Sequence, residues 1–271
     1  MPRHFQHIGS RTIAYHDSAP GDAKARVCVL MHAFPLSAAM WEPQLQNIPD
    51  GWRFIAPDLR GFGGSSESDP SDGESIDDFA SDVVALLAEL GITEGVIGGM
   101  SMGGYVAMAI LRRAPHLANA LIFADTRMGA DSPEGRANRR GMIALVDREG
   151  PSGIAREMMP KLLGKTTRES NPQIEPVVRH LINRQSPAAI RSGIMRMMQR
   201  PDSTPMLAAT HLPTLVIVGE EDEITPPAES QRIADGIPGS SLVVVPKAGH
   251  LSSLECPEPF NHALATFLAR L

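Results

Sequence analysis

Residues 94–111 read EGVIGGMSMGGYVAMAIL, and at their centre residues 99–103 fit the pattern G-x-S-x-G around Ser101. This pattern is typical of a sharp turn that lifts a serine hydroxyl off the end of a strand and onto the start of a helix. Glycines are needed two positions to either side of the serine, because a side chain there would collide with the neighbouring strand or helix. The residues before the motif predict that strand, and residues 104–111, followed by Pro115, predict the helix.

Short apolar runs recur along the chain with helical segments between them. They are rich in Val, Ile and Leu and lack the alternation of a half-exposed strand, so they suit strands buried on both faces of a parallel sheet. We therefore predict an α/β fold with a mostly parallel central sheet flanked by helices. The runs are Val27–Met31, Phe54–Ala56, Val96–Ile97, Leu121–Phe123, Leu215–Val218 and Leu242–Val245.

Two other segments have the apolar spacing of helices that bury one face on such a sheet. The first follows Ser75, a predicted N-cap with Asp78 three positions on, and ends before Gly91. The second spans residues 260–271 at the end of the chain.

Residues 127–208 differ in composition from the rest of the chain. Strand-like runs disappear, and the segment carries 14 Lys and Arg against 8 Asp and Glu, although the whole chain has a net charge of -6. We predict a helical cap at 127–208, inserted into a core domain formed by residues 1–126 and 209–271. Its arginines either cover solvated helix faces or, at positions such as Arg127 or Arg191, favour an anionic substrate. Prolines are expected to break its helices at Pro151, Pro160, Pro172, Pro176 and Pro187.

Overall composition excludes several classes of protein. An acidic chain does not favour a nucleic-acid-binding surface across the whole molecule. No stretch approaches the ~18 to 20 apolar residues of a membrane span, and the N-terminus has no signal-peptide run, so we predict a cytoplasmic protein without membrane contact. Cys28 and Cys256 form neither a metal-binding spacing nor a disulfide framework, and we expect both to be buried as small hydrophobic side chains.

A serine hydroxyl is a poor nucleophile at neutral pH, so a base must lie beside it and a carboxylate must fix the tautomer of that base. Asp222 follows the strand-like run 215–219, and His250 follows the run 242–245. Both therefore lie beyond the carboxyl ends of strands, where open α/β sheets place their ligands. The chain order Ser, Asp, His is also the order expected for this serine turn.

Two further motifs complete a resemblance over nearly the full chain. Residues 32–35, HAFP, resemble the HGxP stretch of the α/β-hydrolase superfamily, and residues 58–65, DLRGFGGS, resemble its D-x-R-G-x-G-x-S loop. Within that superfamily, GMSMGG followed by Asp125-Thr-Arg127 most resembles esterases and enol-lactonases of the 3-oxoadipate enol-lactonase type. A serine in place of an aspartate at the turn disfavours epoxide hydrolases and haloalkane dehalogenases.

The resemblance implies an oxyanion hole formed by the backbone N–H groups of Phe34 and Met102. It also implies that His32 is structural and holds the loop in place. The usual glycine after His32 is replaced by Ala33, and because alanine resists positive φ, the loop is expected to differ slightly in geometry.

Other residues compete for these roles. Asp125 ends another strand-like run and is an alternative to Asp222 as the acid. Glu220, Glu221 and Glu223 crowd Asp222 and are expected to face solvent. Trp41 is expected to pack in the core or to reach the substrate pocket.

The activity implied is hydrolysis of a small carboxylic ester or lactone through an acyl-enzyme on Ser101, with no metal or organic cofactor. The same fold and residues also serve C–C hydrolases, cofactor-free peroxidases and hydroxynitrile lyases, and a ligand receptor with slow turnover is a further alternative. The expected partner is a small-molecule substrate, and the expected assembly is a monomer or homodimer. The identity of the substrate depends on the cap, where the sequence is least informative.

Overall fold

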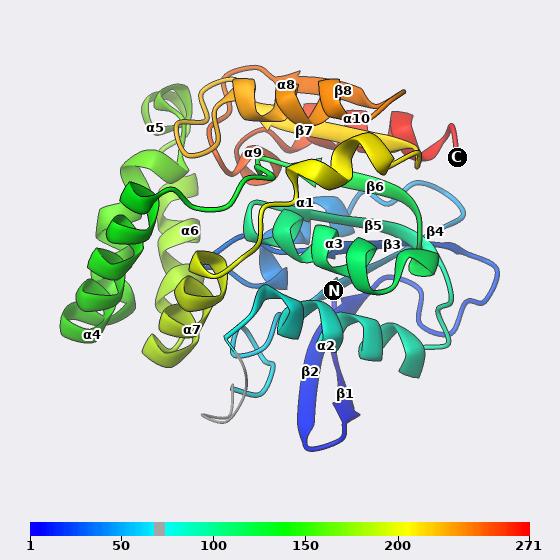
Figure 1. Cartoon of the computed structure of the whole chain (residues 1–271), viewed down its shortest axis with the longest axis horizontal. Coiled ribbons are helices and arrows are strands. Elements are labelled where there is room, and N and C mark those ends of the chain that lie inside the picture. Colours follow the sequence, from blue (N-terminus) through cyan, green and yellow to red (C-terminus); the bar gives the residue numbers. More distant parts are fainter. Residues whose placement is uncertain (68–73) are drawn as a thin grey trace.

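The computed structural model describes residues 1–67 and 74–271. Eight strands form one sheet in the order β1-β2-β4-β3-β5-β6-β7-β8 (Figure 1). Strand β2 is antiparallel to both of its neighbours, and β3 to β8 are parallel to one another. The predicted α/β fold with a mostly parallel sheet is confirmed. The strands are β1 (Arg3–Ile8), β2 (Arg11–Asp17), β3 (Arg26–Met31), β4 (Trp52–Pro57), β5 (Gly95–Met100), β6 (Ala118–Ala124), β7 (Thr214–Gly219) and β8 (Ser241–Val245).

Each predicted apolar run lies in a strand, but the hairpin β1–β2 was missed. Its first strand, RHFQHI, is polar and half exposed because it forms one edge of the sheet, so it contains no apolar run. Strand β8 forms the other edge, and Val244 is 43% exposed there. The expectation of two buried faces is therefore wrong for β8.

Helices cover both faces of the sheet. In Figure 1, α2 and α3 lie in front of it, whereas α1 and α10 lie behind. The predicted N-cap of α2 is present: Ser75 Oγ accepts a hydrogen bond from the Asp77 N–H, and Asp78 accepts one from the Ser75 N–H at 2.9 Å. Gly91 ends this helical region with a φ of +68°. The helices of the core are α1 (Glu42–Leu45), α2 (Ile76–Glu89), α3 (Met102–Arg113), α8 (Pro227–Gly236), α9 (Ser252–Glu255) and α10 (Pro257–Leu268), with 3-10 turns η1 (Ala38–Trp41) and η2 (Pro115–Leu117).

The segment between β6 and β7 is helical, as predicted, and lies to one side of the sheet (Figure 1). It contains α4 (Pro133–Leu162), α5 (Lys165–Ser170), α6 (Ile174–Asn183), α7 (Pro187–Met198) and the 3-10 turn η3 (Thr204–Ala209). We call this segment the cap; its boundaries at 127 and 208 remain a prediction. Within it, α4 packs on α6 and α7.

The cap prolines do not all break helices. Helix α4 has a break at Gly150, whose φ is +64°, and Pro151 begins its second half. Pro160, in contrast, lies inside that half, and Pro176 lies in the first turn of α6. A proline is tolerated in a first turn because the N–H that it lacks has no acceptor there. The expected breaks at Pro160 and Pro176 are therefore wrong.

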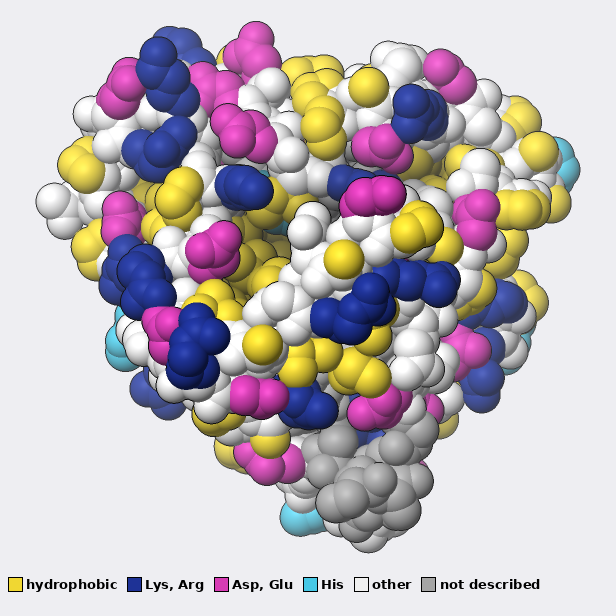
Figure 2. Space-filling view, turned by 60° about the vertical axis from the view of Figure 1, so that its left-hand side comes forward, with side chains coloured by type: hydrophobic (Ala, Val, Ile, Leu, Met, Phe, Trp, Pro, Cys, Tyr) yellow, Lys and Arg dark blue, Asp and Glu magenta, His cyan; other side chains and the backbone are white. Residues whose placement is uncertain are grey.

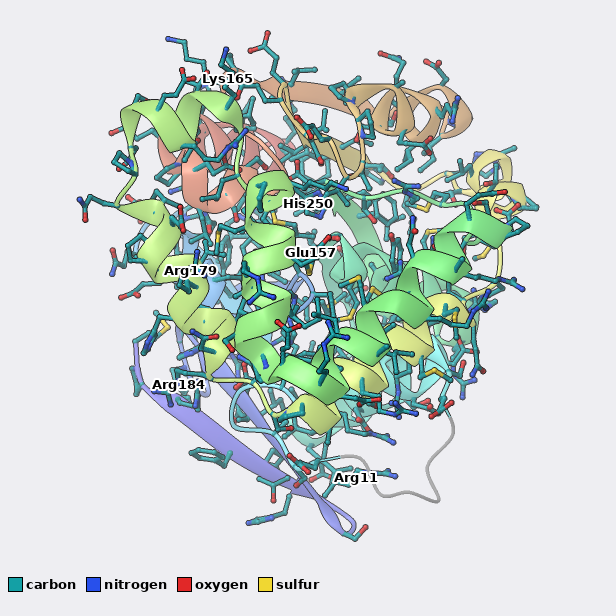
Figure 3. All side chains as sticks on the ribbon, turned by 90° about the vertical axis from the view of Figure 1, so that its left-hand side faces the viewer. Arg11, Glu157, Lys165, Arg179, Arg184 and His250 are labelled. Atoms are coloured by element: carbon teal, nitrogen blue, oxygen red, sulfur yellow. The ribbon has the colours of Figure 1, made fainter. Side chains whose placement is uncertain are left out.

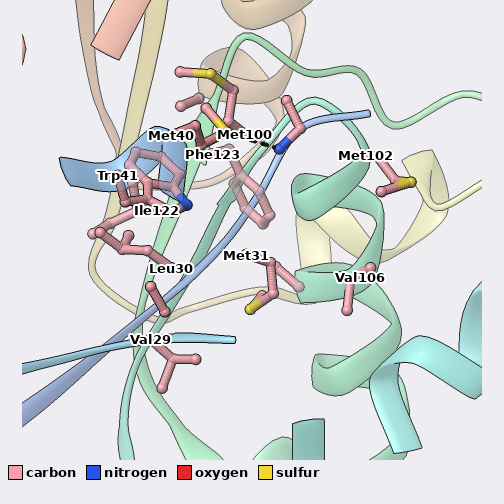
Figure 4. Packing of buried hydrophobic residues seen from close by; sticks show 14 of the residues in the cluster. Val29, Leu30, Met31, Met40, Trp41, Met100, Met102, Val106, Ile122 and Phe123 are labelled. Carbon is pink, nitrogen blue, oxygen red and sulfur yellow. Dashed lines mark hydrogen bonds between the residues drawn. The ribbon is translucent and has the colours of Figure 1, made fainter. Parts of the chain in front are cut away.

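Buried hydrophobic side chains lie on both faces of the sheet. Figure 4 shows Met31 of β3 and Phe123 of β6 on the face toward α3, and Leu30 of β3 with Ile122 of β6 on the opposite face. All four side chains are buried. Cys28 is also fully buried, whereas Cys256 is only half buried. This packing fixes the end of β5, where Ser101 lies.

No helix in the described ranges 1–67 and 74–271 is both long and apolar enough to cross a membrane.

Candidate active site

The turn between β5 and α3 holds Ser101 in a strained conformation. Ser101 has a φ of +54° and a ψ of -112°, a backbone conformation that residues other than glycine rarely adopt. Gly99 and Gly103 allow the tight turn: a Cβ on Gly99 would lie 2.3 Å from the Gly103 carbonyl carbon, and one on Gly103 would lie 2.1 Å from the Met31 carbonyl oxygen. The predicted strand, turn and helix are therefore present. A side chain at either glycine would collide with neighbouring backbone, as predicted.

Ser101, His250 and Asp222 lie together although they are far apart in the sequence. The Nε2 of His250 is 2.9 Å from the Ser101 hydroxyl oxygen, and its Nδ1 is 2.8 Å from Asp222 Oδ2. An ionised carboxylate can only accept, so Nδ1 carries the proton and Nε2 is free to accept from the serine. The structure thus brings together the three residues that the sequence singled out.

The Asp222 carboxylate is held by several donors. Oδ1 accepts the N–H groups of Ile224 and Thr225, and Oδ2 accepts the Thr225 hydroxyl at 2.7 Å. Burial opposes the charge, but the positive charge of His250 and the hydrogen bonds from His250 and Thr225 together lower the Asp222 pKa below its usual value. Sequence analysis missed Thr225; its only signal is a threonine three residues after the aspartate, a spacing typical of a local side-chain turn.

Asp125, the competing acid, is buried but binds elsewhere. Its carboxylate accepts the Gly219 N–H at 2.8 Å and the Ser252 hydroxyl. Burial, followed by the nearby negative charge of Asp222, raises the Asp125 pKa well above its usual value. Asp222, and not Asp125, is therefore the carboxylate that contacts His250.

The N–H groups of Phe34 and Met102 are the two that were predicted to form the oxyanion hole. Met102 is the first residue of α3, so its N–H has no acceptor within the helix. The Phe34 N–H likewise donates to no acceptor among the described residues. Both N–H groups are thus free to bind an anionic oxygen, as the prediction requires.

His32 joins the loop after β3 to the loop after β4. Its Nε2 accepts the Leu59 N–H at 3.0 Å, and its Nδ1 lies 2.9 Å from the Ala33 carbonyl oxygen. Both bonds require the neutral tautomer with the proton on Nδ1, and burial lowers the His32 pKa accordingly. Asp58 adds a second link by accepting the Ala38 N–H at 2.7 Å.

Ala33 causes no backbone strain at the glycine position of the motif. Among the described residues other than glycine, positive φ occurs at Ser101, Asp125 and Lys247. Ala33 therefore does not have a positive φ. The reason for expecting a different loop geometry, that alanine resists a positive φ, does not apply.

Both cap arginines that were considered for an anionic substrate have a protein partner. Arg127 donates to the carbonyl of Ile224, two residues after Asp222. Arg191 pairs with Asp147 at 2.8 Å, and both side chains are about half exposed. Arg127 thus supports the Asp222 loop, and Arg191 links α7 to α4.

Two other residues near the site also take structural positions. Trp41 is fully buried, with its ring centroid 6.0 Å from that of Phe260, so it packs in the core. Glu221 does not simply face solvent: its carboxylate accepts the Thr166 N–H at 2.8 Å and so binds the cap. The expectation that Glu221 faces solvent is wrong.

The cap lies on the same side of the molecule as His250. Figure 3 shows His250 among the cap helices, with Lys165 above it and Glu157 below it in the view. The space-filling view of this side shows a hollow with hydrophobic side chains in its depth and charged side chains on its rim (Figure 2). Ser101 itself is only 8% exposed.

Comparison with known proteins identifies the class to which this fold and site belong. A model of the alpha/beta hydrolase family matches residues 28–263. The match covers most of the chain, so the chain belongs to the alpha/beta hydrolase family, as its motifs indicated.

Individual relatives match it over most or nearly all of its length. The chain is 28% identical to 3-oxoadipate enol-lactonase 2 of Acinetobacter baylyi over 98% of both chains. It is 28% identical to the pimeloyl-(acyl-carrier protein) methyl ester esterase of Neisseria meningitidis, over 85% of this chain and 89% of that protein. Among solved structures, a thermophilic esterase from Thermogutta terrifontis has a TM-score of 0.91 and 38% identity, over 100% of this chain and 99% of the other.

Proposed function

We propose that this carboxylic ester hydrolase cleaves a small ester or lactone through an acyl-enzyme formed on Ser101. The observation that carries the proposal is the contact of 2.9 Å between His250 Nε2 and the Ser101 hydroxyl, with Asp222 bound to the opposite ring nitrogen. The relatives named as an esterase and an enol-lactonase support the same bond type.

In the first step, the Ser101 oxygen attacks the substrate carbonyl while His250 Nε2 takes the hydroxyl proton. The negative charge that develops on the carbonyl oxygen is bound by the N–H groups of Phe34 and Met102. The positive charge on His250 is stabilised by Asp222. When the ester C–O bond breaks, His250 returns the proton to the leaving alcohol oxygen.

In the second step, water attacks the acyl group with His250 again as the base, and the acid product leaves as Ser101 regains its proton. A lactone follows the same course, but its alcohol and acid remain on one molecule. We place the substrate in the hollow on the cap side, where hydrophobic side chains would contact an apolar acyl or alcohol group (Figure 2). A cytoplasmic location and a monomeric or homodimeric assembly remain predictions.

Covalent labelling of the nucleophile tests this function. The protein is incubated with a fluorophosphonate, the modified residue is found by mass spectrometry, and hydrolysis of p-nitrophenyl esters and of a γ-lactone is followed in parallel. We expect labelling at Ser101 and turnover of at least one substrate class. The variant Ser101→Ala should be folded, unlabelled and inactive.

Labelling at Ser101 without ester or lactone turnover would instead favour a C–C hydrolase, a peroxidase, a lyase or a receptor. Absence of labelling in the folded protein, or ester hydrolysis by Ser101→Ala at the wild-type rate, would contradict the proposal.

A further inference from the structure

Glu255 is a buried carboxylate that the mechanism above does not use. It is the last residue of α9, five positions after His250, and only 7% of it is exposed. A buried carboxylate is costly unless strong hydrogen bonds compensate for the lost hydration. The partners of Glu255 therefore indicate what its charge stabilises.

Its two oxygens bind two different parts of the chain. Oε1 accepts the N–H of Leu251, the residue after His250, at 3.0 Å. Oε2 accepts the N–H of Gly164, in the cap segment between α4 and α5, at 2.7 Å. One carboxylate thus joins the histidine loop to the cap.

The surroundings of Glu255 also act on its pKa. Burial raises the Glu255 pKa, while nearby polar groups, among them the Thr167 side chain and the N–H groups of Gly164 and Leu251, oppose that rise. Leu251 follows His250 directly in the chain, and Gly164 belongs to the cap. The carboxylate is therefore bound next to His250 on one side and to the cap on the other.

The backbones that Glu255 joins are in direct contact. A Cβ on Gly249 would lie 2.2 Å from the Gly164 nitrogen, and one on Gly164 would lie 2.8 Å from the Gly249 nitrogen. Such an approach is open only to glycine. Gly164 of the cap thus packs directly against Gly249, the residue before His250.

We propose that Glu255 is a positioning residue: by joining the Leu251 N–H, next to His250, to the Gly164 N–H of the cap, it keeps His250 Nε2 within hydrogen-bond distance of Ser101. This inference rests on the proposed function, in which that distance determines proton transfer. A displacement of the base by about 1 Å can lower a catalytic rate by about 100-fold, so the effect should appear in kcat more than in KM.

The variant Glu255→Gln tests the proposal with little change of shape. One carboxylate oxygen becomes an NH₂ group, which faces a backbone N–H at either Leu251 or Gly164 whichever way the amide turns. We expect kcat and the rate of fluorophosphonate labelling at Ser101 to fall together by about 10- to 100-fold, with KM changed by less than about threefold. Rates are expressed per labelled site, so that unfolded protein does not contribute.

Glu221→Gln is the matched control. Glu221 also binds the cap, but its partners are the N–H and hydroxyl of Thr166, and a hydroxyl can accept from an amide as well as donate to it. We expect its kcat to stay within about twofold of wild type. Glu255→Asp keeps the charge but is too short to reach both sides, so it should give an intermediate loss of kcat and serves if Glu255→Gln does not fold.

A second readout does not depend on turnover. The proton on His250 Nδ1, bound to Asp222, gives a downfield ¹H resonance that should be sharp in wild type and Glu221→Gln but broadened or lost in Glu255→Gln. If wild type shows the resonance but no labelling at Ser101, the proposed function fails while the role of Glu255 is still tested. If Glu255→Gln, or Glu255→Asp where only that variant folds, keeps the wild-type resonance and kcat, the positioning role is refuted.

Discussion

The hydroxyl of Thr225 lies 2.7 Å from Oδ2 of Asp222, the same carboxylate oxygen that contacts His250 Nδ1. The carboxylate that contacts the imidazole is therefore also held by a donor on its own loop. A side chain three residues away thus sets the orientation of the acid, and through it the tautomer of His250.

Thr225→Val removes this hydroxyl at nearly constant volume. A hydrogen bond to a charged carboxylate contributes about 1.5 to 3 kcal/mol, so kcat for a p-nitrophenyl ester should fall by roughly 13- to 160-fold. Thr225→Ser retains the hydroxyl and should stay near the wild-type kcat. Equal losses in both variants would indicate that the methyl group, and not the hydrogen bond, is needed.

Asp222→Asn and Asp125→Asn distinguish the two candidate acids. An amide at 222 can present its NH₂ to Nδ1 and so favour the wrong tautomer, which should lower kcat by about 10³- to 10⁴-fold. At 125 an amide can still accept the Gly219 N–H and can donate to the Ser252 hydroxyl, so kcat should stay within about fivefold of wild type. Steady-state ester hydrolysis by both variants at one pH decides between them; the reverse order of losses would assign the acid to Asp125.

A buried ion pair between β2 and β4 is expected to be sensitive to the loss of one partner. Arg53 binds Asp17 through two hydrogen bonds of 2.9 and 2.7 Å, and both side chains are buried. Asp17→Ala leaves the guanidinium buried without its partner and should lower the free energy of unfolding by about 3 to 5 kcal/mol. Adding Arg53→Met should recover part of that loss, as measured by urea denaturation.

The exposed pair of Arg191 and Asp147 serves as the control for this measurement. Asp147→Ala should change the free energy of unfolding by no more than about 1 kcal/mol, because exposed pairs are screened by water. A similar loss at both sites would show that burial does not determine the effect.

The sequence predicted most of the core and the three residues in contact at the site, because each has a local signal. Ser101 lies in a turn that only certain residues can form, and Asp222 and His250 each follow an apolar run. The edge strand β1 lacked such a signal, since its exposed position does not require apolar residues. An analysis of hydrophobic runs therefore tends to miss strands at the edge of a sheet.

The supporting residues were not predictable for a different reason. Glu255 resembles any acidic residue in a short helix, and its role depends on Gly164, which is 91 positions away. Glu221 was expected to face solvent because nothing near it in sequence indicates Thr166. Contacts between loops that are distant in sequence leave no periodic pattern, so they became visible only in the folded structure.

The neutral His32 should make stability depend on pH. Burial lowers the His32 pKa in the folded protein, whereas in the unfolded chain it should be near 6.5. Below that value the unfolded state binds a proton that the folded state does not, so stability is present above about pH 6.5 and is lost as the pH falls. Each pH unit below 6.5 should cost up to about 1.4 kcal/mol until the folded-state pKa is reached.

Urea denaturation at pH 7.5 and 5.5 measures this dependence. His32→Gln offers one acceptor and one donor but does not titrate, so its free energy of unfolding should fall less between the two pH values than that of wild type, although it starts lower at pH 7.5. His262, an exposed histidine of α10, provides the control variant His262→Gln, which should keep the wild-type dependence. If His32→Gln loses as much stability on acidification as wild type, then the proton taken up on unfolding belongs to another group, and His32 is not the source of the pH dependence.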